Sequence, residues 1–149
     1  MRYAIELAKR CPPSDSAFNV GAVVVANNTI VAQGYSRQFG PLDHAEEVAL
    51  RQWRETEGDP VDLSEASIYS TLEPCGYRAS RPTPCARHII DSGLRRVVYA
   101  QDEPDTFVSA PSGADQLRRA GINIVYLAKL ADAAWELNGH LMLVCRICH

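Results

Sequence analysis

The sequence predicts a three-layer α/β/α protein in which a mixed five-stranded sheet lies between two layers of helices. Two observations lead to this fold class. Short apolar segments alternate with helical segments over most of the chain, which is typical of parallel strands joined by right-handed crossovers. Near the start, two strand segments follow each other directly and add an antiparallel pair. The length of 149 residues suits a single domain over 1–149.

The first half of the chain begins with helical spacing of apolar residues, which two prolines end. A Val-rich apolar run follows, as in a buried strand. Asn27-Asn28 then predicts a hairpin turn, because Asn tolerates positive φ. The expected elements are a helix at 1–10, strands at 20–26 and 29–35, a helix at 44–54 and a strand at 66–72.

The second half alternates more regularly. Pro84 suits the first turn of a helix, and Gly93 suits its end. The expected elements are a helix at 84–93, a strand at 96–100, a helix at 114–120, a strand at 123–127, a helix at 128–139 and an apolar tail at 141–149.

Composition narrows the class of protein. Hydrophobic residues are 46% and charged residues 22%, which excludes a disordered chain. No apolar run approaches the roughly 20 residues of a membrane span, so we expect no membrane partner. The formal net charge of −3 disfavours a nucleic-acid partner. The cysteine count of five is odd, and the charged N-terminal helix is unlike an export signal, so we expect a cytoplasmic protein.

Three segments carry metal-binding chemistry: His44-Ala45-Glu46, Thr71 to Cys75, and Pro84-Cys85. We expect each thiol just before or at a helix start, where the helix dipole lowers a thiol pKa. One imidazole and two thiolates are three zinc ligands, which leave one tetrahedral position for water, as in catalytic sites. Glu46 lies on the same turn as His44 and could reach that water without binding the metal.

Other interpretations of these residues are possible. The three ligands could be a helix-start histidine and two buried free cysteines. A structural zinc site would need His88 as a fourth ligand and would leave Glu46 without a role. In the tail, Cys145 and Cys148 belong to a C-x-x-C-H string, which occurs at haem attachment sites but needs export, and a coincidental apolar tail is the simpler interpretation.

The arrangement resembles the zinc-dependent base deaminases, whose signature is H-x-E…P-C-x-x-C with Glu as general acid and base. Here nine residues separate the cysteines instead of two. The chain is similar to the deaminase domain of riboflavin biosynthesis over 4–9, 20–25, 44–46, 71–75 and 84–90. The bacterial branch usually has S-H-x-G-[KR]-T-P-P between the cysteines, where this chain has GYRASRPTP. The segments 16–18, 34–37 and 103–108 look instead like the fungal branch.

The resemblance implies a cytidine-deaminase-like fold, one Zn2+ per chain and a homodimer. It also implies hydrolytic deamination of 2,5-diamino-6-ribitylamino-4(3H)-pyrimidinone 5'-phosphate at C2, with release of ammonia. Glu46 would carry the protons, and no nicotinamide cofactor is expected. The alternative is a zinc deaminase of the same fold that acts on another base, nucleotide or specialised metabolite.

Candidate substrate-binding residues are predicted from charge and position in the sequence. The stretch from Pro74 to Gln101 carries five arginines and one aspartate, a balance of +4 in a chain of −3. Arg78 and Arg81 lie between two zinc ligands and Arg37 lies before His44, so each is either a phosphate ligand or part of a solvated basic face. We expect Asp105 and Thr106 at the carboxyl end of the fourth strand, binding ribityl hydroxyls, although Asp105 could equally form a turn.

Overall fold

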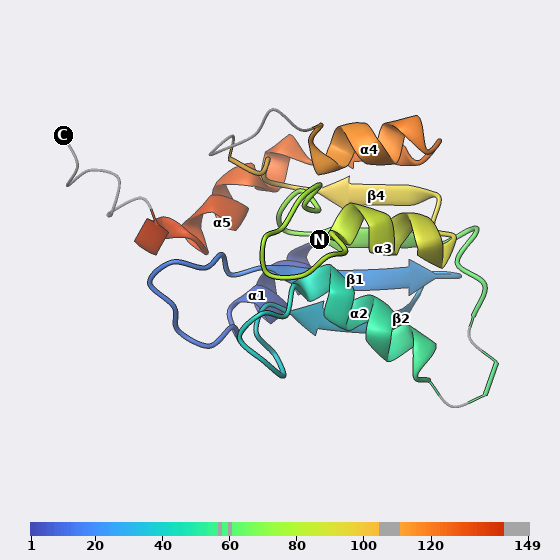
Figure 1. Ribbon diagram of the computed structural model, residues 1–149, viewed down its shortest axis with the longest axis horizontal. Helices are drawn as coiled ribbons and strands as arrows, with labels where there is room; N and C mark the ends of the chain where they lie inside the picture. The colour runs from blue at the N-terminus through green and yellow to red at the C-terminus, as the bar shows by residue number, and fades with distance from the viewer. Residues whose placement is uncertain (57, 60, 105–110, 142–149) are drawn as a thin grey trace.

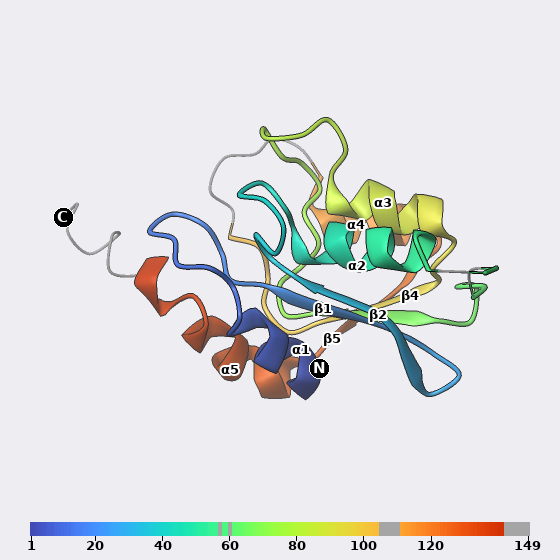
Figure 2. The same ribbon diagram turned by 90° about the horizontal axis from the view of Figure 1, so that it is seen from below.

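The computed structural model describes residues 1–56, 58–59, 61–104 and 111–141, and it shows three layers (Figures 1 and 2). A five-stranded sheet of order β2-β1-β3-β4-β5 forms the middle layer. Helices α2, α3 and α4 cover one face of the sheet, and α1 and α5 cover the other (Figure 2). The predicted fold class, a mixed five-stranded sheet between two helical layers, is confirmed.

The N-terminal elements follow the predicted order. Helix α1 (Arg2–Ala8) precedes strands β1 (Gly21–Ala26) and β2 (Thr29–Tyr35), which pair antiparallel. The turn between them has Asn27 at φ 49° and Asn28 at φ 59°. These positive φ values are the reason that the Asn pair predicts the hairpin.

The middle of the chain carries the site. Helix α2 (Ala45–Arg54) and strand β3 (Ser67–Ser70) are followed by helix α3 (Cys85–Ser92), which ends at Gly93 with φ 84°. Strand β3 pairs antiparallel with β1 and parallel with β4 (Arg96–Tyr99). The antiparallel hairpin therefore joins the parallel part of the sheet through β1. Local sequence patterns do not predict this strand pairing.

The C-terminal part contains helix α4 (Gly113–Arg119) and strand β5 (Asn123–Tyr126), which pairs parallel with β4. The prediction of a single helix over 128–139 is wrong, because a 3-10 turn (Ala128–Leu130) precedes the shorter helix α5 (Ala131–Glu136). The tail beyond Leu141 lies outside the described residues. No helix in the described part of the chain has the length and apolar character needed to cross a bilayer.

The main core fills the space between the sheet and the three helices that carry or flank the site. Its fully buried members include Val24, Ile68 and Val97 from the sheet and Leu50 and Ile89 from the helices. Dense packing of this kind fixes the helix ends relative to the strands.

Gly34 brings α2 close to the hairpin. A Cβ atom built there would lie 2.7 Å from the carbonyl oxygen of Ala45, so only glycine permits this approach. The contact lies at the first residue of α2, directly beside His44 and Glu46, and it fixes the depth at which these two residues enter the site.

Candidate active site

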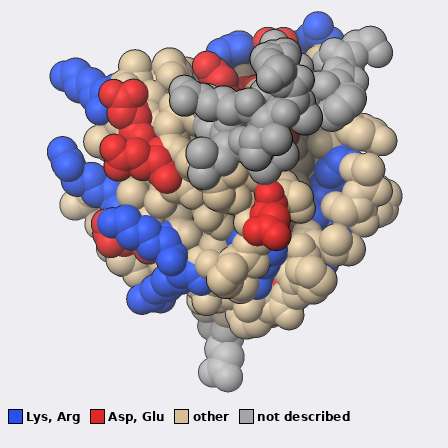
Figure 3. Space-filling view, turned by 90° about the vertical axis from the view of Figure 1, so that its left-hand side faces the viewer, with Lys and Arg blue, Asp and Glu red and all other residues tan. Residues whose placement is uncertain are grey.

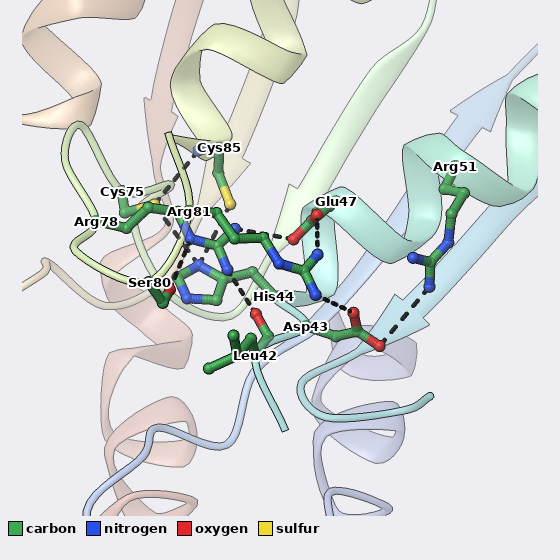
Figure 4. Close-up of polar contacts among 10 residues, drawn as sticks. All are labelled: Leu42, Asp43, His44, Glu47, Arg51, Cys75, Arg78, Ser80, Arg81 and Cys85. Carbon is green, nitrogen blue, oxygen red and sulfur yellow. Dashed lines mark hydrogen bonds and ion pairs between the residues drawn. The ribbon is translucent and has the colours of Figure 1, made fainter. Parts of the chain in front are cut away.

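Three metal-ligating side chains converge just beyond the carboxyl end of β3 (Figure 4). His44 is the N-cap residue of α2, and its imidazole faces the thiols instead of capping a described amide of the helix. Cys75 lies in the loop after β3, and Cys85 is the first residue of α3. The three ligand atoms all lie within 4.8 Å of one another.

The donor set fits a zinc ion. Tetrahedral coordination, with Zn–S distances of about 2.3 Å and Zn–N distances of about 2.0–2.1 Å, places sulfur and nitrogen ligands about 3.5 Å apart. Nδ1 of His44 lies 3.6 Å from Sγ of Cys75 and 3.4 Å from Sγ of Cys85. Two thiols and an imidazole are also donors that zinc prefers, and three protein ligands leave one position open.

Cys75 corrects one expectation. We expected it just before a helix start in the sequence, but it lies in a loop, and the next helix, α3, begins only at Cys85. The chain folds back so that the backbone N–H of Cys85 donates to Sγ of Cys75 at 3.3 Å. The N–H of Ala86 also donates to the carbonyl of Cys75 at 3.0 Å. Both thiols therefore share the N-terminus of the same helix, although only one adjoins it along the chain.

The two thiols differ in acidity. Hydrogen bonds from Cys85 and His44 lower the pKa of the Cys75 thiol to about 4. The hydrogen bond with Cys75, together with burial, raises the pKa of the Cys85 thiol well above its ordinary value. One thiolate thus forms readily in this protein environment, and a bound cation would favour ionisation of the second.

Glu46 is buried beside the three ligands. It lies in the first turn of α2, only 3% exposed, where its negative charge suits the helix dipole. Ser70 Oγ, at the end of β3, donates to Glu46 Oε1 at 2.7 Å and fixes the carboxylate. Burial raises the pKa of this carboxyl group above its ordinary range, which suits a group that both accepts and returns a proton.

A pocket of about 210 Å³ opens onto His44, Glu46 and Cys75. Phe18 and Leu72 supply apolar wall, which suits the faces of a small heterocycle.

Two further glutamates line this pocket, and the sequence analysis did not predict them as site residues. Glu73 is buried and accepts hydrogen bonds from the N–H groups of Ala114 at 2.9 Å and Glu103 at 3.1 Å. It therefore ties the loop that carries Cys75 to α4 and to the segment after β4. Burial, with the nearby charges of Cys75 and Glu73, raises the pKa of Glu103 to about 7. The signals in the sequence were a carboxylate directly before Pro-Cys for Glu73 and, for Glu103, its place in the segment 103–108.

Arg37, a predicted phosphate ligand, lies at the pocket wall and holds the preceding loop. Its backbone has φ 60°, and its guanidinium donates to the carbonyls of Pro12 and Phe18 and to Oδ1 of Asn19. A role in binding phosphate stays a prediction for this residue.

Arg78 and Arg81 lie in the loop between the two cysteines and form ion pairs with Glu47, and Arg81 also pairs with Asp43 (Figure 4). The arginine network was not predicted, and the role of both residues in binding phosphate stays a prediction. On the face drawn in Figure 3, the basic side chains stand in separate groups beside acidic ones. Asp105 and Thr106 lie outside the described residues.

Fold and site together define a class of protein: a three-layer α/β domain with a His-Cys-Cys metal site and a buried glutamate beside it. A family model described as the cytidine and deoxycytidylate deaminase zinc-binding region matches residues 1–101. The chain belongs to this family. The match supports zinc as the metal for His44, Cys75 and Cys85.

Known relatives narrow the comparison. A diaminohydroxyphosphoribosylamino-pyrimidine deaminase of Schizosaccharomyces pombe is 43% identical over 126 residues, which are 84% of this chain and 30% of that protein. The riboflavin biosynthesis protein RibD of Actinobacillus pleuropneumoniae is 40% identical over 129 residues, 84% of this chain and 31% of its own length. The chain thus spans about a third of the length of these relatives.

Solved structures agree with the fold. The deaminase/reductase of Thermotoga maritima superimposes with a TM-score of 0.77 at 33% identity, covering 92% of this chain and 37% of the other. The Rib2 deaminase of Aspergillus oryzae, solved in complex with DARIPP, gives a TM-score of 0.74 at 27% identity and covers 91% and 86% of the two chains.

Proposed function

We propose that this protein is a zinc-dependent hydrolase that deaminates a phosphorylated diaminopyrimidinone in riboflavin biosynthesis. The observation that carries the proposal is the buried carboxylate of Glu46 beside three converging metal ligands, inside a pocket. A fourth protein ligand would suit a structural site, whereas three ligands and a proton carrier suit hydrolysis. The S. pombe and A. pleuropneumoniae relatives, named for a pyrimidine deaminase and for riboflavin biosynthesis, support the substrate class.

His44, Cys75 and Cys85 would hold the zinc ion, which in such a site supplies a nucleophile from water at neutral pH. Glu46 takes the proton that this water loses and delivers it to a ring nitrogen while the C–O bond forms at the amine-bearing carbon. A second proton passes through Glu46 to the amine as the C–N bond breaks. The balance is one water consumed, one carbonyl formed and one ammonia released.

We further propose that the ribitylamino form, 2,5-diamino-6-ribitylamino-4(3H)-pyrimidinone 5'-phosphate, is the substrate. The fungal-like segments and the A. oryzae complex with DARIPP support this form, whereas the name of the S. pombe relative points to a phosphoribosylamino compound. Asp105 and Thr106 are proposed to bind the chain hydroxyls. Of the two arginines between the cysteines, Arg81 has the more exposed side chain, 32% against 3% for Arg78, which favours Arg81 over Arg78 as a phosphate ligand.

The test is ammonia release from a panel of amines. The ribitylamino pyrimidine phosphate is compared with its ribosylamino counterpart, cytosine, cytidine and deoxycytidylate, with zinc per chain measured in parallel. We expect turnover of the ribitylamino compound and little of the other four. Preferential turnover of a cytosine compound would instead support a different deaminase of the same fold, and a zinc-loaded protein inactive on all five would contradict the proposal.

We also propose a homodimer in the cytoplasm. The family resemblance supports the dimer, and the cysteines in the described residues, which are all free, support a reducing compartment. Light scattering of the purified protein tests the dimer, and cell fractionation tests the compartment.

A further inference from the structure

The loop between the two thiol ligands carries an arginine that is almost completely buried. The side chain of Arg78 is 3% exposed. Its Nη1 donates to Oε2 of Glu47 at 2.8 Å, its Nη2 donates to the carbonyl of Leu42, and its Nε donates to Oγ of Ser80 at 3.3 Å (Figure 4). All three guanidinium nitrogens thus bond to protein atoms, which sets this arginine apart from a solvated charge.

The partners of Arg78 lie on either side of the histidine ligand. Leu42 comes two residues before His44, and Glu47 lies on the first turn of α2 after it. Arg78 itself comes three residues after Cys75, in the loop that leads to Cys85. One planar guanidinium therefore joins the two chain segments that together carry all three metal-ligating side chains and Glu46.

Arg81 makes a second connection between the same segments. It pairs with Oε1 of Glu47 and, at 3.2 Å, with Oδ1 of Asp43, the residue before His44. Glu47, whose side chain is 12% exposed, thus divides its two oxygens between two arginines of the loop. Because the Arg81 side chain is 32% exposed, Arg78 is the buried member of the pair.

We propose that Arg78 is a positioning residue that holds the loop between Cys75 and Cys85 against the His44 segment and so sets the geometry of the metal site. A guanidinium fork is suited to this task because it donates in two directions at fixed angles, which a lysine ammonium does not reproduce. In this role Arg78 acts through Glu47 and Leu42 and makes no contact with a substrate phosphate. The activity readouts below rest on the proposed deaminase function, but the zinc readout does not.

The experiment compares Arg78→Lys and Glu47→Gln with wild-type protein loaded with zinc. The first measurement is the rate at which zinc passes to a chromogenic chelator. The second is kcat and KM for the phosphorylated pyrimidine and for its dephosphorylated form. Arg87→Lys is the matched control, since Arg87 lies on the same helix as Cys85 but is 61% exposed and pairs with Asp91 in the next turn.

We expect both test variants to release zinc faster and to lose kcat by about 10- to 100-fold, the range typical of residues that orient metal ligands. The loss should be equal for the two substrates, and Arg87→Lys should match wild type. Circular dichroism and melting temperature verify that each variant is folded. Faster zinc release in a protein that deaminates neither substrate would support the positioning role and contradict the proposed function alone.

Two results would overturn the positioning role. In the first, zinc release is unchanged and Arg78→Lys raises KM only for the phosphorylated substrate, which would make Arg78 a phosphate ligand. Glu47→Gln would then lower that KM, because both arginines would be released to bind phosphate. In the second, zinc release and kcat stay at wild-type values while the melting temperature falls, which would leave Arg78 a purely structural residue.

Discussion

Replacing Glu46 by Gln separates proton transfer from every other property of the site. The residue is 3% exposed, and glutamine has nearly the same shape, so the substitution leaves no cavity. Ser70 Oγ can donate to the amide oxygen as it does to Oε1 at 2.7 Å, so the hydrogen bond that holds this side chain is kept. Glu46→Gln should therefore fold, bind zinc and retain the pocket.

The expected loss of activity follows from the number of transfers that the carboxylate makes. Loss of general acid–base catalysis typically costs about 10²- to 10⁴-fold, which is about 2.7–5.4 kcal/mol at 1.36 kcal/mol per tenfold. Because the same group accepts and donates protons in turn, we expect kcat to fall by at least the upper figure. The folded Glu46→Gln protein should be as stable as wild type or more stable. Burial raises the pKa of this carboxyl group, so keeping the group ionised costs more free energy in the folded protein than in the unfolded chain, and a neutral amide removes that cost.

Three measurements decide the outcome: ammonia release at saturating substrate, zinc per chain, and melting temperature. Glu55→Gln is a matched control, since Glu55 lies at the exposed C-terminal end of α2. Activity within tenfold of wild type in a folded, zinc-loaded Glu46→Gln protein would refute the role given to Glu46. Loss of zinc in that variant would show that the carboxylate acts on the metal site instead.

Three other perturbations test the rest of the site. Cys75→Ser and Cys85→Ser should lose zinc together with activity, measured as metal per chain, and retention of one zinc per chain by either variant would exclude that thiol as a ligand. Arg81→Ala should raise KM for phosphorylated substrate about tenfold, at the low end of a charge-assisted hydrogen bond because a third of the side chain is exposed. An equal rise in KM for the dephosphorylated substrate would show that Arg81 belongs to a solvated basic face and does not bind phosphate. Asp105→Ala should weaken a preference for the ribitylamino over the ribosylamino substrate, seen in the ratio of their kcat/KM values, and an unchanged ratio would remove Asp105 from recognition.

Much of the fold can be predicted from the sequence because its strands and turns are local patterns. The second strand was predicted with its observed bounds, Thr29–Tyr35, since the Asn pair fixes where the turn must fall. Helix α3 begins one residue later than predicted, with Pro84 as its N-cap residue. By contrast, the antiparallel pairing of β1 with β3 joins residues more than 40 positions apart and leaves no local signal.

The site residues likewise divide into those that local motifs predict and those whose contacts join distant parts of the chain. His44, Glu46 and the two cysteines stand out because their residue types and short motifs are chemically specific. The ion pair of Arg78 with Glu47 spans 31 positions, and its hydrogen bond to Leu42 spans 36. Counting charge along the loop showed a basic stretch, but it could not show that two of its arginines face carboxylates across the site.

The wide spacing of the cysteines is connected with the arginines that lie between them. In a C-x-x-C motif, local geometry places the second thiol beside the first. With nine residues between them, Cys85 must be brought back by other contacts. The N-terminus of α3 supplies one of these, through the N–H that Cys85 donates to Cys75 Sγ. Arg78 and Glu47 supply another, because their ion pair fixes the middle of the loop to the helix that follows the histidine. The loop therefore contains the residue that anchors it to α2. Its positive charge serves this contact, which the nine-residue spacing between the cysteines requires.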